Sequence, residues 1–150
     1  MAKKTRVQLT TGRDFGDLLD SMVLKTNRVI HQPAHATTAD STAVVSAANV
    51  LTGIVACTPT ADRSKASDTA ANFISSLGLE ENDDAFDFSF INLATDGASA
   101  VTLTAGTGVT LVGRMVIMGQ DAAEDAVAEG VAVFRIRRTA ATTVTMYRIS

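Results

Sequence analysis

The sequence predicts a mainly β protein: a β-sandwich or jelly-roll-like body with one short helix, preceded by an extended N-terminal arm. Apolar and polar residues alternate in several short runs, as they do in strands that bury one face. Val and Thr are abundant and Gly recurs between the runs, which favours strands joined by turns. The runs predict about eight strands, a number typical of a sandwich or a jelly roll.

Length and composition indicate an ordinary globular chain. The chain has 150 residues, enough for a domain with its own core, and its hydrophobic fraction is 46%. No apolar run approaches the roughly 20 residues of a membrane span. The basic N-terminus has no apolar stretch behind it, so we expect no signal peptide. Cys57 is the single cysteine, which excludes an intrachain disulfide and suits a reducing cytosol.

Charge is distributed unevenly along the chain. Residues 1–38 carry six basic and three acidic side chains, a balance of +3, whereas residues 39–150 carry seven basic and thirteen acidic ones, a balance of −6. An acidic body argues against general nucleic-acid binding. A basic arm is compatible with docking onto another surface. We therefore divide the chain into a docking arm with a linker, residues 1–40, and a β-domain, residues 41–150.

The arm combines basic residues with a short amphipathic segment. Its apolar side chains recur at helical spacing, which predicts a short helix that must dock on something to be stable. Whether it packs on its own domain or on a partner stays open at this point. Lys25–Ile30 is interpreted as a short strand and His31–Asp40 as a linker without periodicity. The candidate docking residues of the arm are Lys3, Lys4, Arg6, Arg13, Phe15, Leu18, Leu19 and Met22.

The run from Phe86 to Leu93 is the predicted centre of the body. Phe86, Phe88 and Phe90 alternate with Asp87 and Ser89, so the three rings should share one face of a strand and enter the core. A turn at 95–98 follows, and then a second alternating run at 101–105.

The best helix of the chain precedes that strand. Ala70, Phe73, Ile74 and Leu77 form a stripe at helical spacing, and Gly78 stands where a helix often ends. We expect Ser67 or Asp68 to cap its first turn. Phe73, Ile74 and Leu77 join the predicted core.

Other elements follow from turn residues and alternation. Strands are predicted at 42–46 and 50–57, ahead of Pro59. Gly106 and Gly108 predict a sharp reversal before a strand that begins at Val109, and 114–118 is expected to be extended. Residues 120–130 read as a polar loop. Two final runs, 131–138 and 143–149, predict a β-hairpin.

Three patterns resemble ligand sites, and each has a simpler interpretation. His31 and His35 have the spacing of a helical metal pair, but Pro33 between them opposes a helix. Gly106-Thr107-Gly108 lacks the third glycine and the helix of a dinucleotide loop, which favours a turn. The acidic residues at 80–87 lack the spacing of an EF-hand, which favours a solvated loop. We therefore expect no metal and no cofactor.

The terminal hairpin carries a cluster of arginines. Two interpretations stay open: a solvated face that neutralises nearby carboxylates, or pairing with another subunit or with a partner surface. No aromatic residues are interleaved for stacking, so single-stranded nucleic-acid binding is poorly supported. No motif organises a catalytic triad, and we expect no enzyme activity. The hairpin residues named for contacts are Arg135, Arg137, Arg138, Tyr147 and Arg148.

Several stretches of the body occur in a familiar order: "TAANFISSL", "FSFINLA", "VTLTAGTGVTLVG" and the end "FRIRRTAATTVTMYRIS". This succession resembles a C-terminal β-domain of tailed-bacteriophage virion proteins, chiefly capsid decoration (cement) proteins and head or tail fibres. The resemblance covers residues 41–150. It implies a trimerising β-domain whose role is binding. A fibre normally carries more chain, so the short length points to a decoration protein.

The resemblance implies two partners, the protein itself as a homotrimer and the major capsid protein. The expected location is the exterior of the virion capsid, after synthesis in the host cytoplasm, with no membrane and no nucleic-acid partner. One alternative is a head-fibre or tail-associated attachment module. Another is a carbohydrate-binding module, against which weigh the absence of Trp and the single tyrosine, Tyr147.

Overall fold

The computed structural model describes residues 32–120 and 130–150. The amphipathic segment, the strand expected at 25–30 and His31 therefore lie outside the described residues. So does most of the polar loop at 120–130. The candidate docking residues that lie outside are Lys3, Lys4, Arg6, Arg13, Phe15, Leu18, Leu19 and Met22.

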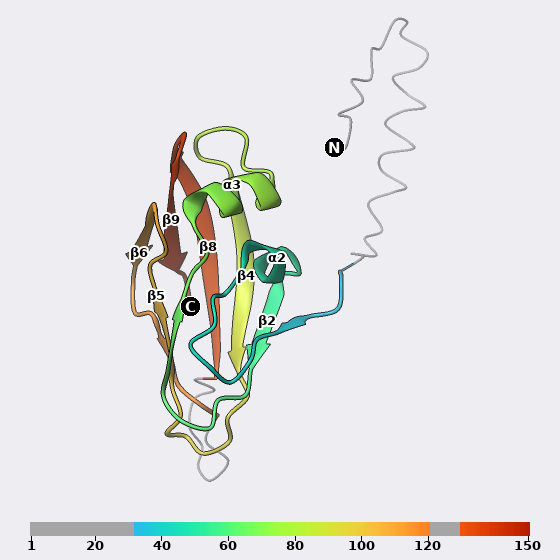
Figure 1. Cartoon of the computed structure of the whole chain (residues 1–150), viewed down its shortest axis with the longest axis vertical. Helices are drawn as coiled ribbons and strands as arrows, with labels where there is room; N and C mark the ends of the chain where they lie inside the picture. The colour runs from blue at the N-terminus through green and yellow to red at the C-terminus, as the bar shows by residue number, and fades with distance from the viewer. Residues whose placement is uncertain (1–31, 121–129) are drawn as a thin grey trace, which may run out of the picture. The chain divides into compact units, whose positions relative to one another are not determined.

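The described residues of the body form two β-sheets and two short helices (Figure 1). The larger sheet has six strands, in the order β1 (Ala36–Thr37), β2 (Ile54–Cys57), β4 (Ala85–Asn92), β8 (Val131–Ala140), β9 (Thr143–Arg148) and β6 (Val109–Val112). The smaller sheet has the order β3 (Arg63–Ala66), β5 (Val101–Thr104) and β7 (Val116–Ile117). The helices are α2 (Ala47–Leu51) and α3 (Ala70–Leu77). The prediction of a mainly β fold is confirmed.

The arrangement is sandwich-like, because one hydrophobic cluster takes side chains from both sheets and both helices. Both sheets are mixed. β4 pairs antiparallel with β8, and β8 with β9, whereas β2 runs parallel to β4, β6 to β9 and β3 to β5. A jelly roll is built of antiparallel strands. The parallel ladders therefore distinguish this body from a jelly roll.

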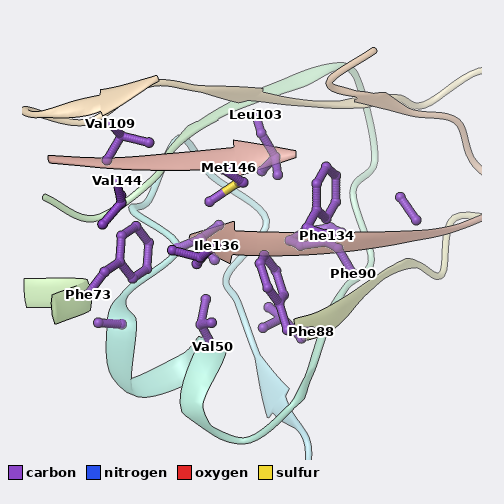
Figure 2. Packing of buried hydrophobic residues seen from close by; sticks show 14 of the residues in the cluster. Val50, Phe73, Phe88, Phe90, Leu103, Val109, Phe134, Ile136, Val144 and Met146 are labelled. Carbon is purple, nitrogen blue, oxygen red and sulfur yellow. The ribbon is translucent and has the colours of Figure 1, made fainter. Parts of the chain in front are cut away.

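The Phe strand is at the centre of the core, as the alternation predicts. Phe88 and Phe90 are buried and Phe86 is partly buried, while Asp87 is exposed. Phe88 lies opposite Phe134 of β8, and their rings stack with centroids 5.4 Å apart (Figure 2). Phe73 of α3 is also buried. The other predicted core residues, Ile74 and Leu77, are partly buried against the same cluster.

The N-cap of helix α3 is neither Ser67 nor Asp68, the two residues predicted from the sequence. Thr69 is the N-cap, and its hydroxyl accepts a hydrogen bond from the backbone N–H of Asn72 at 3.2 Å. Asp68 holds the Asn72 side chain and also accepts from the N–H of Ala47 at 2.9 Å. Asp68 thus ties the two helices together instead of capping α3. Gly78 ends the helix with φ 67°, as predicted.

Two predicted strands before Pro59 need correction. Residues 50–51 belong to helix α2, whose N-cap Ser46 accepts from the N–H of Asn49 at 3.2 Å. Only Val45 of the stretch 42–46 makes a β-bridge, with Ser67. The capping serine and the Asp68 bond to Ala47 favour a helical turn that the apolar pattern alone does not reveal.

Two strands were missed because their residues do not alternate in polarity. β3 reads Arg-Ser-Lys-Ala and is a strand only because it pairs with β5 in parallel. β1 lies within the stretch interpreted as a linker, and it pairs with β2. The compact unit that contains the body begins at Gln32, so the linker interpretation is wrong for residues 36–40.

The glycine reversal and the hairpin agree with prediction. Gly108 has φ 77°, and a strand, β6, follows the reversal, which confirms the predicted turn. The carbonyl of Thr107 accepts from the N–H of Ala70, so the reversal closes over the start of α3. β8 and β9 form the terminal hairpin. None of the helices in the described ranges is long and apolar enough to cross a membrane.

Candidate interaction surface

The face of the larger sheet that points away from the core is the strongest candidate for a binding surface. The register places Asp87 beside Arg135, Arg135 beside Tyr147, and Tyr147 beside Val112, in one row across β4, β8, β9 and β6. The neighbouring positions in each strand point into the core. This alternation places the row on the outward face of the sheet.

A bidentate ion pair lies in that row. Arg135 donates from Nε to Oδ1 of Asp87 and from Nη2 to Oδ2, both at 2.7 Å. The hydrogen bonds from Arg135 lower the pKa of Asp87, and those to Asp87 raise the pKa of Arg135. Both side chains are about half exposed (49% and 45%), so water screens the pair and it contributes little to stability. A second pair, Arg137 with Asp83, lies beside it.

The other two hairpin arginines bind backbone carbonyls. Nη1 of Arg138 donates to the carbonyls of Leu79 and Glu80, which fixes the loop after α3. Nη1 of Arg148 donates to the carbonyls of Arg114 at 3.1 Å and Val116 at 2.6 Å. Arg148 therefore joins β9 of the larger sheet to β7 of the smaller one.

The four arginines of the predicted cluster thus have two different kinds of partner within the chain. Arg135 and Arg137 neutralise carboxylates on the exposed face, and Arg138 and Arg148 hold loop and strand backbone. Each guanidinium has a partner inside the chain. The contacts expected of these residues with other molecules stay a prediction.

Apart from Tyr147, the apolar side chains on the same face were not singled out from the sequence. Val131 lies beside Ile91, and the N–H of Ile149 donates to the carbonyl of Val133 at 2.9 Å, which brings these residues together next to the ion pairs. Val131, Ile149 and Val112 are exposed. We call this set the outer patch; its members are Ile91, Val112, Val131, Val133, Tyr147 and Ile149. The signal in the sequence is the start of β8, where both faces are apolar.

For the residues of the acidic loop and for His35 we expect no bound metal, and their surroundings are as follows. The carboxylate of Asp84 accepts from the N–H of Glu81 at 2.9 Å, and Asp83 pairs with Arg137. His35 is exposed. Within the part of the chain that the structure describes, no group of three or more His, Cys, Asp and Glu side chains is arranged to hold a metal ion.

Comparison with known proteins adds no relative. No family model, no curated protein and no solved structure matches the chain.

Proposed function

We propose that this protein is a structural virion protein of a tailed bacteriophage: a capsid decoration protein that binds the outer surface of the head as a homotrimer and stabilises the shell. The sequence resemblance supports this proposal, and the mainly β body has the fold class that the resemblance implies. The observation that carries it is the outer patch, an exposed apolar area on a broad sheet face. Exposed apolar patches mark protein–protein contacts.

In this proposal the outer patch is buried between subunits of the trimer. The ion pairs beside it combine two aspartates with two arginines, so this part of the face has no net charge. A second copy can approach it without the repulsion expected between acidic bodies. Cyclic symmetry then covers exposed sheet surface in every subunit.

The arm attaches the trimer to the major capsid protein, with Lys3, Lys4, Arg6 and Arg13 meeting acidic capsid surface. A protein that binds the assembled shell and not its separate subunits shifts the equilibrium toward the intact shell by mass action. This mechanism needs affinity and geometry but no catalysis.

The test uses one patch variant and one matched control. Ile149→Asp places a charge in the outer patch, and Val44→Asp places the same charge at a residue that is equally exposed, at 50%, but lies outside the patch. We expect light scattering to show a trimer for the parent chain and for Val44→Asp, and a folded monomer for Ile149→Asp. A parent chain that is monomeric at all concentrations contradicts the trimer.

Localisation tests the decoration role itself. We expect cryo-electron microscopy of purified particles to show the protein on the outer surface of the head, and added protein to co-sediment with heads that lack it. Density at the tail, or on fibres, would assign the chain to the attachment module that the sequence left as an alternative.

A further inference from the structure

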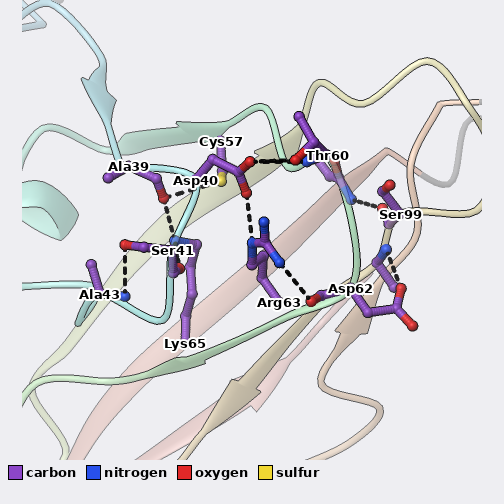
Figure 3. A network of polar contacts seen from close by, with 12 residues as sticks. Ala39, Asp40, Ser41, Ala43, Cys57, Thr60, Asp62, Arg63, Lys65 and Ser99 are labelled. Atoms are coloured by element: carbon purple, nitrogen blue, oxygen red, sulfur yellow. Dashed lines mark hydrogen bonds and ion pairs between the residues drawn. The ribbon is translucent and has the colours of Figure 1, made fainter.

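The segment 36–41, here called the strap, connects the edges of the two sheets. Its first residues form β1 beside β2 of the larger sheet, and Asp40 then reaches Arg63 of β3 in the smaller sheet (Figure 3). Val45 continues along β3, since its N–H donates to the carbonyl of Ala66. The strap therefore closes one open side of the sandwich.

The strap is held by polar contacts more than by apolar packing. The N–H of Thr38 donates to the carbonyl of Ala56 at 2.8 Å. Asp40 accepts from Nε of Arg63 at 2.7 Å and from the hydroxyl of Thr60 at 2.7 Å. No residue of the strap belongs to the hydrophobic cluster of the described body. Such contacts are replaced by water when the strap leaves.

A buried lysine adds two more polar contacts that water can replace. Lys65 of β3 is fully buried, and its Nζ donates to the carbonyls of Ala39 at 2.7 Å and Ser41 at 2.8 Å, both on the strap (Figure 3). Holding an ammonium away from water has a large desolvation cost. When the strap opens, the ammonium loses two carbonyls but regains water.

Cys57, the only cysteine of the chain, lies under the strap. Its side chain is fully buried, and its thiol faces the Ala39 carbonyl, with Sγ and the oxygen 3.8 Å apart. Departure of the strap would leave the thiol beside an open edge of the larger sheet. The thiol is therefore a natural probe for the position of the strap.

We propose that the strap is a releasable element, which opens as a local unit while both sheets stay folded, and so uncovers Cys57 and the edge of β2. Residues 32–35 join the strap to the preceding part of the chain. An uncovered β2 edge presents unpaired backbone groups. The inference does not rest on the proposed function.

Thiol labelling of the full-length native chain tests the proposal. We expect 5,5′-dithiobis(2-nitrobenzoic acid) to label Cys57 by a local opening, so that the labelling rate depends only weakly on low concentrations of urea. Global unfolding depends steeply on urea, because it exposes the whole core. Labelling with the full urea dependence of global unfolding would overturn the proposal.

Two variants distinguish an effect on the strap from an effect elsewhere in the molecule. Asp40→Ala removes the carboxylate that fastens the strap to Arg63, and Asp87→Ala removes one that pairs with Arg135 on the outer face. We expect Asp40→Ala to raise the labelling rate about fivefold or more, which corresponds to the loss of about one hydrogen bond. Asp87→Ala should leave the rate unchanged. Equal labelling rates of Cys57 in both variants would contradict the proposal that opening of the strap uncovers this residue.

Hydrogen exchange gives a second readout that needs no substitution. We expect the amide of Thr38, bonded to Ala56, to exchange much faster than the amides of the β4–β8 ladder. Exchange of Thr38 as slow as that of the ladder would show that the strap opens only when the body unfolds.

Discussion

At the scale of single residues, the two faces of β4 differ sharply in what they contribute. Phe88 is buried and stacks on Phe134, whereas Asp87, the preceding residue, is exposed and paired with Arg135. Burial of aromatic surface stabilises the fold, while a solvated ion pair adds little. The alternation in the sequence therefore corresponds to an energetic difference between neighbours.

Substitution of these neighbours tests that difference. We expect Phe88→Ala to lower the free energy of unfolding by about 3–5 kcal/mol, because it leaves a cavity beside Phe134. Asp87→Ala should lower it far less. Urea denaturation of both variants measures the two effects, and equal losses would contradict the burial of one face only.

Asp40 provides a prediction about pH. The hydrogen bond from Arg63, followed by that from Thr60, lowers the pKa of Asp40 from 3.8 to about 2. Because the pKa is lower in the folded chain than in the unfolded one, the contribution of Asp40 to stability is present above about pH 4 and is lost as the pH falls toward 2. We expect an NMR titration of the carboxyl carbon to show this low pKa. In Arg63→Gln the pKa should return toward its usual value, and an unchanged pKa would contradict the assigned cause.

At the scale of elements, α3 and the reversal before β6 fit closely against each other. Gly106 donates its N–H to the hydroxyl of Ser67 at 2.9 Å. A Cβ at Gly106 would lie 2.4 Å from the carbonyl oxygen of Asp68. These neighbours are backbone atoms at the start of α3, and they cannot move aside without moving the helix.

A pair of glycine substitutions measures this fit. Gly106→Ala should lower the free energy of unfolding by about 3 kcal/mol or more, because of the backbone clash. At Gly78, which has φ 67° and no atom within 4 Å of an added Cβ, we expect Gly78→Ala to show only the strain of a left-handed residue. That strain is about 1–2 kcal/mol. Thermal or urea unfolding of both variants checks the order, and a milder effect at Gly106 would contradict it.

At the scale of the whole molecule, we propose that the body folds and trimerises and that the arm attaches the trimer to the capsid. Among the described residues, the core takes its side chains from residue 45 onward. We expect deletion of residues 1–30 to leave a folded trimer that no longer binds undecorated heads. Circular dichroism, sizing and co-sedimentation measure the three properties.

A single substitution in the arm provides the matching experiment. Leu18→Asp should weaken binding to heads almost as much as the deletion, because it places a charge in an apolar contact. Normal decoration by either variant would move the attachment surface to the β-body, most directly to the hairpin at 135–148.

The sequence alone determined the mainly β class, the Phe strand, helix α3, the glycine reversal and the terminal hairpin. These elements have local causes: a period of two or 3.6 residues, a glycine with positive φ, or a short polar link between two alternating runs. Phe88, Phe90 and Phe73 could be assigned to the core for the same reason.

Only the tertiary structure decided β1, β3, the cap of α3 and the partners of the arginines. β3 is polar, and it is a strand because it pairs with β5. Asp68 does not cap α3 as expected, because its carboxylate accepts a hydrogen bond from the N–H of Ala47, 21 residues away. Arg148 binds the carbonyls of Arg114 and of Val116 on β7, 34 and 32 residues away in the chain. The strap depends on Lys65 in the same way. Each of these features rests on contacts between distant segments, which no local pattern of residues encodes.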